Sequence, residues 1–304
     1  MLFLNLALVG CSSLTSRSSA RNDIDPEIRN VPVSARDEAP RKRILVLPFL
    51  DASTRRSETI PSVARSAVIS WLARTNRFVI VNNDDFPKDV SQYLENGEYN
   101  LEAVAKIAAG MGVAAVIEGK VLEIKARRIG DRVGIIRSIH ANVDATIQIR
   151  TVATKNSKEI LNIKKSASIR STTQRVGKYS YSDKDLEEDP KLVHDVTVKA
   201  FKGVIKPLAL SIDKLSWEGR VALVKGEQIF INAGRLSGLQ VGDVLKVTES
   251  SEEVYDPDSG ALIGHVPGRM KGTLEVVSYF GRDGSITVLH SGAGILENDR
   301  VELY

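Results

Sequence analysis

The sequence has little of three things that would point to common classes of protein. It contains one cysteine in 304 residues, so no internal disulfide can form. Its 42 basic and 38 acidic residues are too evenly balanced to predict a nucleic-acid partner. After residue 11, no stretch reaches the ~20 uncharged apolar residues that a membrane-spanning helix needs. The length suits two modest domains better than one.

Catalytic and metal-binding motifs are also missing. Gly119 and Lys120 lack the glycine-rich context of a phosphate-binding loop. Residues 256–260 lack the spaced acidic ligands of a calcium loop, and their Pro and Gly predict a tight turn. The spacing of the four histidines does not suit metal ligands. We therefore expect neither an enzyme nor a cofactor. The histidines are His140, His194, His265 and His290.

The cysteine, Cys11, follows a short apolar segment. Leu8-Val9-Gly10-Cys11 resembles the lipobox of bacterial lipoproteins, in which the cysteine is lipidated after cleavage, and Ser12 replaces the aspartate that signals inner-membrane retention. Residues 1–11 are shorter than most signal peptides and lack a basic start, which a true start codon upstream would explain. The alternative is an apolar tail with an ordinary buried thiol. Residues 12–40, rich in Ser, Arg, Asp and Pro, predict a flexible tether.

Residues 41–212 are predicted to form an α+β domain, a sheet backed by helices. Short apolar runs alternate with segments of helical spacing, which gives the order strand, helix, strand, helix, strand. Asn100 is a predicted helix N-cap and Gly112 a predicted helix end. Pro207 is expected to disturb or end a later helix over residues 192–204. The elements of the first part are predicted at residues 43–50, 60–72, 78–81, 101–111 and 113–124.

A long antiparallel strand is predicted over residues 133–149, where apolar and polar residues alternate with period two, and residues 159–171 should return beside it. From Lys120 to Lys178 the chain has 14 Lys plus Arg against 4 Asp plus Glu, and an acidic run follows. We predict that this run meets the basic face of a neighbouring subunit. Solvated strand faces are the alternative. The candidate contact residues are Lys164, Lys165, Arg170, Asp183, Asp185, Glu187 and Glu188.

Residues 217–304 are predicted to form a small SH3-like β-barrel. Short strands follow one another closely here and are separated by glycines, and a barrel would close its own sheet edges. The boundary between the two domains is expected near residues 211–216. The strands are predicted at residues 220–224, 228–232, 244–248, 272–279, 285–289 and 300–303.

Two stretches resemble known families. Residues 43–49, RILVLPF, and 105–119, AKIAAGMGVAAVIEG, resemble the CsgG-like domain of the curli-secretion lipoproteins. Residues 228–234, 238–247 and 256–264 are similar to the C-terminal barrel of flagellar assembly protein T, a ring protein of flagellar motors that also has a CsgG-like middle domain. The order of the two units agrees, although the further N-terminal domain of that protein has no counterpart here.

The resemblance implies a lipoprotein of the outer membrane, on its periplasmic face, that forms or braces a homo-oligomeric ring, with flagellar basal-body ring proteins as partners. The alternative is a curli-like secretion channel or an accessory subunit of an export apparatus. Each strand of such a channel needs ~9 to 11 residues with an apolar row facing lipid, and Arg or Lys on that row costs ~2 to 4 kcal/mol. Because this region looks short and is rich in basic residues, the ring is favoured over the channel.

Overall fold

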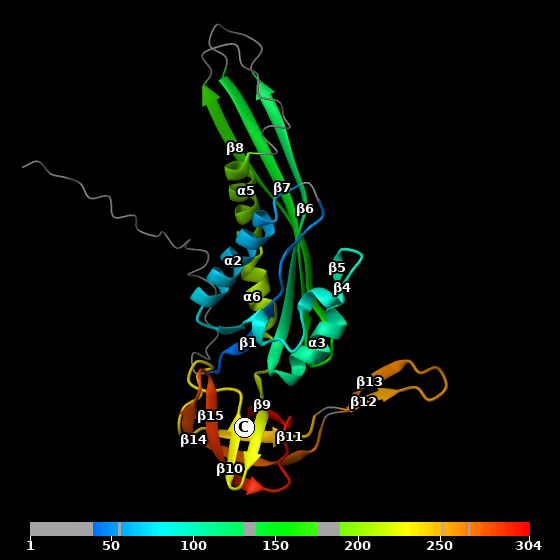
Figure 1. The fold of residues 1–304 in the computed structure, drawn as a ribbon, viewed down its shortest axis with the longest axis vertical. Coiled ribbons are helices and arrows are strands. Elements are labelled where there is room, and N and C mark those ends of the chain that lie inside the picture. The colour runs from blue at the N-terminus through cyan, green and yellow to red at the C-terminus, as the bar shows by residue number, and fades with distance from the viewer. Residues whose placement is uncertain (1–38, 54–55, 131–137, 175–188, 251, 267) are drawn as a thin grey trace, which may run out of the picture.

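The computed structural model describes residues 39–53, 56–130, 138–174, 189–250, 252–266 and 268–304. It contains a mixed sheet covered by helices and, below it, a closed barrel of six strands (Figure 1). The predicted α+β class with a small barrel is confirmed.

The main sheet has the strand order β3-β1-β6-β7-β8. β1 pairs in parallel with β3 and β6, whereas β6, β7 and β8 form an antiparallel meander. The short β2 pairs in parallel with β6. The strands are β1 Lys42–Val46, β2 Leu50–Asp51, β3 Phe78–Val81, β6 Val113–Gly130, β7 Ser138–Ala153 and β8 Glu159–Gln174.

Helices cover one face of this sheet along most of its length and the other face at one end only. α2 (Thr59–Arg74), α5 (Pro190–Lys202) and α6 (Ile205–Asp213) pack on the first face and bury a large apolar cluster with the strands. α3 (Leu101–Gly110) packs on the second face, next to the barrel (Figure 1). The second face is therefore uncovered by helices farther from the barrel.

Side chains of β7 and β8 alternate between the two faces of the sheet, whereas β6 changes register between Val121 and Glu123. On β7, Val143, Ala145, Ile147 and Ile149 are fully buried under the helices, as the period-two pattern predicts. β6 continues to Gly130, beyond the end predicted at Ile124, because its ladder with β7 continues through Lys125 and Arg127. Residues 133–137 of the predicted strand lie outside the described part of the chain.

Local signals set the ends of the helices. Asn100 caps α3 by accepting a hydrogen bond from the Ala103 N–H at 3.1 Å. Gly112, with φ of +69°, follows α3 in the left-handed conformation that glycine favours. The prediction for Pro207 was wrong: α5 ends at Lys202, and Pro207 lies in the first turn of α6, where a missing N–H costs little.

The barrel closes in the order β10-β15-β14-β11-β16-β9, and Trp217 lies in its apolar core. Its strands are β9 Glu218–Lys225, β10 Gln228–Ile231, β11 Val244–Thr248, β14 Met270–Phe280, β15 Gly284–Gly292 and β16 Arg300–Leu303. Two small hairpins and two 3-10 turns complete the fold. They are η1 Asn83–Asp85, η2 Val90–Tyr93, β4 Leu94–Glu95 with β5 Glu98–Tyr99, and β12 Glu252–Tyr255 with β13 Leu262–Val266.

Candidate functional site

The face of β6, β7 and β8 that lies opposite α2, α5 and α6 is here called the open face, and polar side chains line it. Strand pairing places its side chains in cross-strand rows, because residues in register on neighbouring strands point the same way. Going away from the barrel, the rows are Glu118, Arg150 and Asn162; Lys120, Gln148 and Lys164; Glu123, Thr146 and Ser166; Lys125, Asp144 and Ser168; and Arg127, Asn142 and Arg170.

Hydrogen bonds connect these rows from strand to strand. The Gln148 amide donates to Asn162 Oδ1 at 2.8 Å, and the hydroxyls of Thr146 and Ser166 lie 2.9 Å apart. The Ser168 hydroxyl donates to the Asp144 carboxylate. These exposed bonds hold the polar side chains in one layer, so the open face presents a fixed pattern of donors and acceptors.

An ion-pair cluster lies at the end of the open face nearest α3. Arg150 contacts the carboxylates of Glu118 at 3.3 Å, Glu98 at 3.1 Å and Glu159 at 3.2 Å. Lys120 contacts Glu98 at 3.3 Å. The Glu118 side chain is only 2% exposed, whereas that of Arg150 is 24% exposed. One buried carboxylate is thus held by a cation that water can still reach.

The titration of the cluster follows from burial. Burial raises the pKa of the Glu118 carboxyl, and the hydrogen bond from the Tyr99 N–H and the charge of Arg150 oppose that rise. Burial, then the charge of Glu118, raises the pKa of Tyr99 to about 12. The Tyr99 phenol therefore stays protonated near neutral pH and cannot act as a base.

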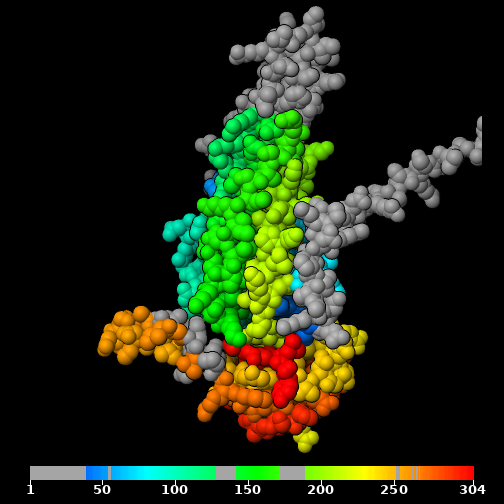
Figure 2. Space-filling view, turned by 180° about the vertical axis from the view of Figure 1, so that it is seen from behind, coloured from blue at the N-terminus to red at the C-terminus, as the bar shows by residue number. Residues whose placement is uncertain are grey.

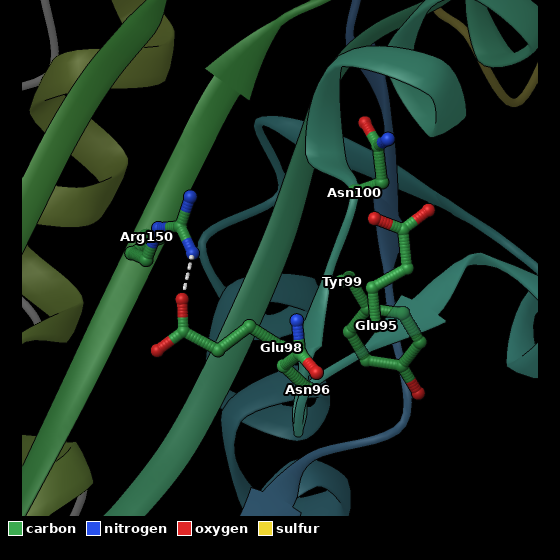
Figure 3. A pocket seen from close by; sticks show the side chains of 6 residues that line it. All are labelled: Glu95, Asn96, Glu98, Tyr99, Asn100 and Arg150. Carbon is green, nitrogen blue, oxygen red and sulfur yellow. Dashed lines mark hydrogen bonds and ion pairs between the residues drawn. The ribbon is translucent and has the colours of Figure 1, made fainter.

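An open hollow of about 290 Å³ adjoins this cluster. The β4–β5 hairpin forms one wall of it: Asn96 and Gly97 both have positive φ, the geometry of a tight Asn-Gly hairpin turn. Figure 3 shows Glu98 reaching across to Arg150, while the carboxylate of Glu95 points away. The lining residues are Glu95, Asn96, Glu98, Tyr99, Asn100 and Arg150.

The hollow is lined by polar and charged side chains. Its one cation is already engaged by three carboxylates, and no nucleophile lies beside a base among the six lining residues. In the parts of the chain that the structure describes, no group of three or more His, Cys, Asp or Glu side chains could hold a metal ion. The described helices include none that is long and apolar enough to span a membrane.

The predicted contact residues fall on different surfaces. Lys164 and Arg170 are exposed on the open face, in rows with Gln148 and Asn142. Lys165, the residue after Lys164, points to the opposite face of the sheet, where its side chain approaches Gly203 beside the helices. Asp183, Asp185, Glu187, Glu188 and the predicted lipidation site Cys11 lie outside the described residues.

Two signatures of the family resemblance have a packing role in this structure. A Cβ on Gly119 would lie 2.6 Å from the Phe49 ring, so only glycine lets that ring lie across β6. The Phe49 ring then packs on Phe201 of α5, with centroids 4.9 Å apart. Phe49 and Gly119 thus help to fix α5 against the sheet.

The two domains meet at a polar junction. The barrel residue Asn232 donates to the Met111 carbonyl at 2.9 Å, and Arg220 Nε donates to the Ala109 carbonyl at 3.0 Å. Both carbonyls lie at the C-terminal end of α3. The last C=O groups of a helix have no partners within the helix and need them from elsewhere. From the sheet side, Arg43 donates to the Asn232 carbonyl at 2.5 Å. The barrel therefore caps α3, and the domains are held in one orientation.

Sequence reasoning did not identify the Arg150 cluster or this junction. The only signals were indirect. Glu118 is an acidic residue in an apolar strand, and Arg43 opens a strand that is otherwise apolar. A charged residue at a buried position needs a partner. The partners lie far along the chain and are set by the fold.

Comparison with known proteins finds neither a matching family model nor a matching curated protein. Among solved structures, the LpoB C-terminal domain from Escherichia coli is 14% identical, with a TM-score of 0.31, covering 47% of this chain and 94% of its own. A lipoprotein from Neisseria meningitidis is 20% identical, with a TM-score of 0.27, over 42% of this chain and 80% of its own. The PelC dodecamer from Paraburkholderia phytofirmans is 12% identical, with a TM-score of 0.27, covering 56% of this chain and 89% of its own. Scores this low say nothing about the activity of this chain.

Proposed function

We propose that this protein is a cell-envelope lipoprotein, anchored through Cys11 to the periplasmic face of the outer membrane, that assembles with copies of itself into a ring. The ring would form or brace part of a flagellar motor. The apolar segment that ends at Cys11 and the polar residues 12–40 supply the anchor and the tether. The folded domains would then sit away from the bilayer.

The open face is the observation that carries this proposal. It spans three long strands, and cross-strand hydrogen bonds already order its polar side chains. Small-molecule sites are concave and largely apolar, which this face is not. A broad polar face with fixed charges suits a wet contact with another protein, whose register it can set through charge.

The resemblance to flagellar ring proteins supports the narrower assignment. It rests on the two quoted stretches and on their order along the chain. The α3–barrel junction adds a physical argument, because a subunit that closes a ring must repeat one rotation at every contact. Domains held by Asn232, Arg220 and Arg43 would deliver that rotation reproducibly.

A secretion channel is the second candidate, and the length of β6 and β7 favours it, since each exceeds the ~9 to 11 residues that a membrane crossing needs. The faces of these strands oppose it. The apolar row of β7 is buried under the helices, and the open face carries Lys125 and Arg127. Lipid contact would require α5 to leave the sheet.

The experiment uses the full lipidated chain, extracted in detergent and observed by mass photometry and negative-stain microscopy. We expect closed rings that salt weakens, because exposed ion pairs are screened within about 10 Å at 0.1 M. The double variant Lys164→Glu, Arg170→Glu should assemble less well than wild type. The control variant Lys191→Glu, which changes an exposed residue of α5, should assemble as wild type does. A chain that stays monomeric at every concentration and salt would refute the ring.

Two further measurements separate the other parts of the proposal. Cys11→Ala should leave the membrane pellet while wild type stays, and equal pelleting would exclude the anchor. Deletion of the gene should alter the basal-body rings seen by electron tomography, and unchanged motors would exclude the flagellar role. Uniform single-channel currents in planar bilayers would favour the channel instead.

A further inference from the structure

The hairpin formed by β12 and β13 stands clear of the barrel. It leaves between β11 and β14 and forms a sheet of its own, projecting to the side in both views (Figures 1 and 2). Its turn is firmly built: the Asp256 carboxylate accepts hydrogen bonds from the Ser259 N–H at 2.7 Å and the Asp258 N–H at 3.1 Å. The hairpin, here called the arm, therefore has a defined turn at its tip.

Apolar side chains of this arm face water. Val254 is 37% exposed, Ile263 66% and Val266 53%. A single two-stranded hairpin is marginally stable in water, and it normally gains stability by packing an apolar face on something else. The arm thus has the composition of a segment that is buried in an assembly.

Gly264 is a second, independent sign of a partner. It lies opposite Val254 in the middle of β13, and its φ is not in the left-handed region. A Cβ added there would meet no atom within 4 Å. Glycine weakens a strand and is typical of places where another backbone or ligand approaches closely. No described contact within this chain requires glycine here, and the close approach of a partner to the arm would account for it.

The barrel carries a second exposed apolar surface, around β10. In the closed barrel, β10 lies three strands away from β11, the strand that precedes the arm. Here Leu223 pairs with Phe230 across β9 and β10, and Phe230 pairs with Ile286 on β15. The rings of Phe230 and Phe280 meet edge to face with centroids 5.3 Å apart. Leu223 is 44% exposed and Phe280 40%. These four residues are called the aromatic patch.

Charge also matches between the arm and the patch. Residues 252–266 include four acidic residues and neither Lys nor Arg. Exposed Lys225 and Arg282 flank the aromatic patch, although Glu227 lies in the same turn as Lys225. Opposite charges around an apolar contact guide the approach and fix its register.

We infer that the β12–β13 arm of one copy docks on the aromatic patch of the next copy. The inference rests on the proposed ring and names its contact. A second copy is the occupant because both halves of the contact lie on one chain, on opposite sides of one barrel. Because the two surfaces lie on opposite sides of the barrel, a contact that joins them leads head to tail from one copy to the next, as in a ring.

Cysteine cross-linking tests this geometry in membranes that contain the full chain. The variants are Ile263→Cys, Phe280→Cys and the two together, treated with a short bismaleimide, with wild type reporting any reaction at Cys11. We expect a ladder of multimers only when both cysteines are present, because each contact joins residue 263 of one copy to residue 280 of the next. Dimers from either single variant would overturn the head-to-tail contact.

A second measurement removes the arm's apolar side chains. Val254→Ser with Ile263→Ser should raise the concentration needed for half-assembly by about tenfold or more, since a few buried anchor residues carry most of the binding energy of an interface. Leu296→Ser is the matched control, because Leu296 is 63% exposed on a loop outside the arm. If the arm variant forms rings as readily as wild type, and the double cysteine variant gives no ladder, the arm contact is refuted while the ring proposal stands. Absence of rings in wild type would refute the proposed function itself.

Discussion

Replacing Arg150 with methionine leaves the buried Glu118 carboxylate without the cation that contacts it at 3.3 Å. Methionine keeps much of the length of the arginine side chain, so the change removes charge with little loss of packing. The carboxylate keeps the hydrogen bond from the Tyr99 N–H at 3.1 Å. The variant therefore measures what the charge of Arg150 does for a carboxylate that is 2% exposed.

The expected cost at pH 8 is about 2 to 3 kcal/mol of unfolding free energy. Breaking a fully buried pair costs about 3 to 5 kcal/mol, and the value is lower here because Arg150 is 24% exposed and Glu118 keeps one hydrogen bond. The contacts of Arg150 to Glu98 and Glu159 are also lost. They are exposed and contribute about 0 to 1 kcal/mol each, which the range given above includes.

The loss should depend on pH. The pKa of Glu118 is already raised from 4.5 by burial, and Arg150 holds it down, so the variant raises it further. A carboxyl whose pKa is higher in the folded state than in the unfolded state contributes most to stability below its ordinary pKa, and that contribution is lost as the pH rises through the folded value. The variant should therefore recover part of its stability between pH 8 and pH 5.

Urea unfolding followed by Trp71 fluorescence gives the measurement. The two tryptophans lie in different domains, so a Trp217→Phe background makes Trp71, which packs on the sheet core, the reporter of the α+β domain. The control is Glu118→Gln combined with Arg150→Met, because the glutamine oxygen still accepts from Tyr99 without carrying charge. A loss that is equal at pH 5 and pH 8, or a double variant no more stable than Arg150→Met alone, would refute the reasoning.

Two other substitutions test the packing and the junction. Gly119→Ala should cost about 1 to 3 kcal/mol in the same unfolding assay, because its Cβ would lie 2.6 Å from the Phe49 ring. Gly110→Ala, where an added Cβ meets nothing within 4 Å, should be neutral or slightly stabilising. Asn232→Ala should split thermal unfolding into separate transitions for the two domains, since it removes the hydrogen bond from the barrel to the Met111 carbonyl. A single unchanged transition in calorimetry would contradict this.

Local patterns predicted the elements well wherever one element decides its own conformation. The Asn100 cap, the glycine after α3 and the alternation of β7 all depend on a few neighbouring residues. β6 was predicted too short, with its end at Ile124, before Lys125 and Arg127. Pairing with β7 continues the strand through them, with Ala126 buried between.

The site could not be predicted in the same way, because it depends on register. Glu118 and Arg150 meet only because β6 and β7 pair with those two residues opposite each other, and a shift of one residue would turn them to opposite faces. Lys165 shows the same limit: it is adjacent to Lys164 in sequence but points to the other face of the sheet. The Asn232 contact with Met111 joins residues 121 positions apart.

The sequence of the β12–β13 arm has features that the fold of a single chain does not explain. Its apolar residues have exposed side chains, and Gly264 opens a space that no atom of this chain fills within 4 Å. Places where local rules fail without compensation are expected at functional sites, where the missing partner is a different molecule. Exposed apolar residues on the arm and on the far side of the barrel are then two halves of one contact. A lone subunit would leave both halves in water, so assembly should stabilise the barrel as well as hold the ring.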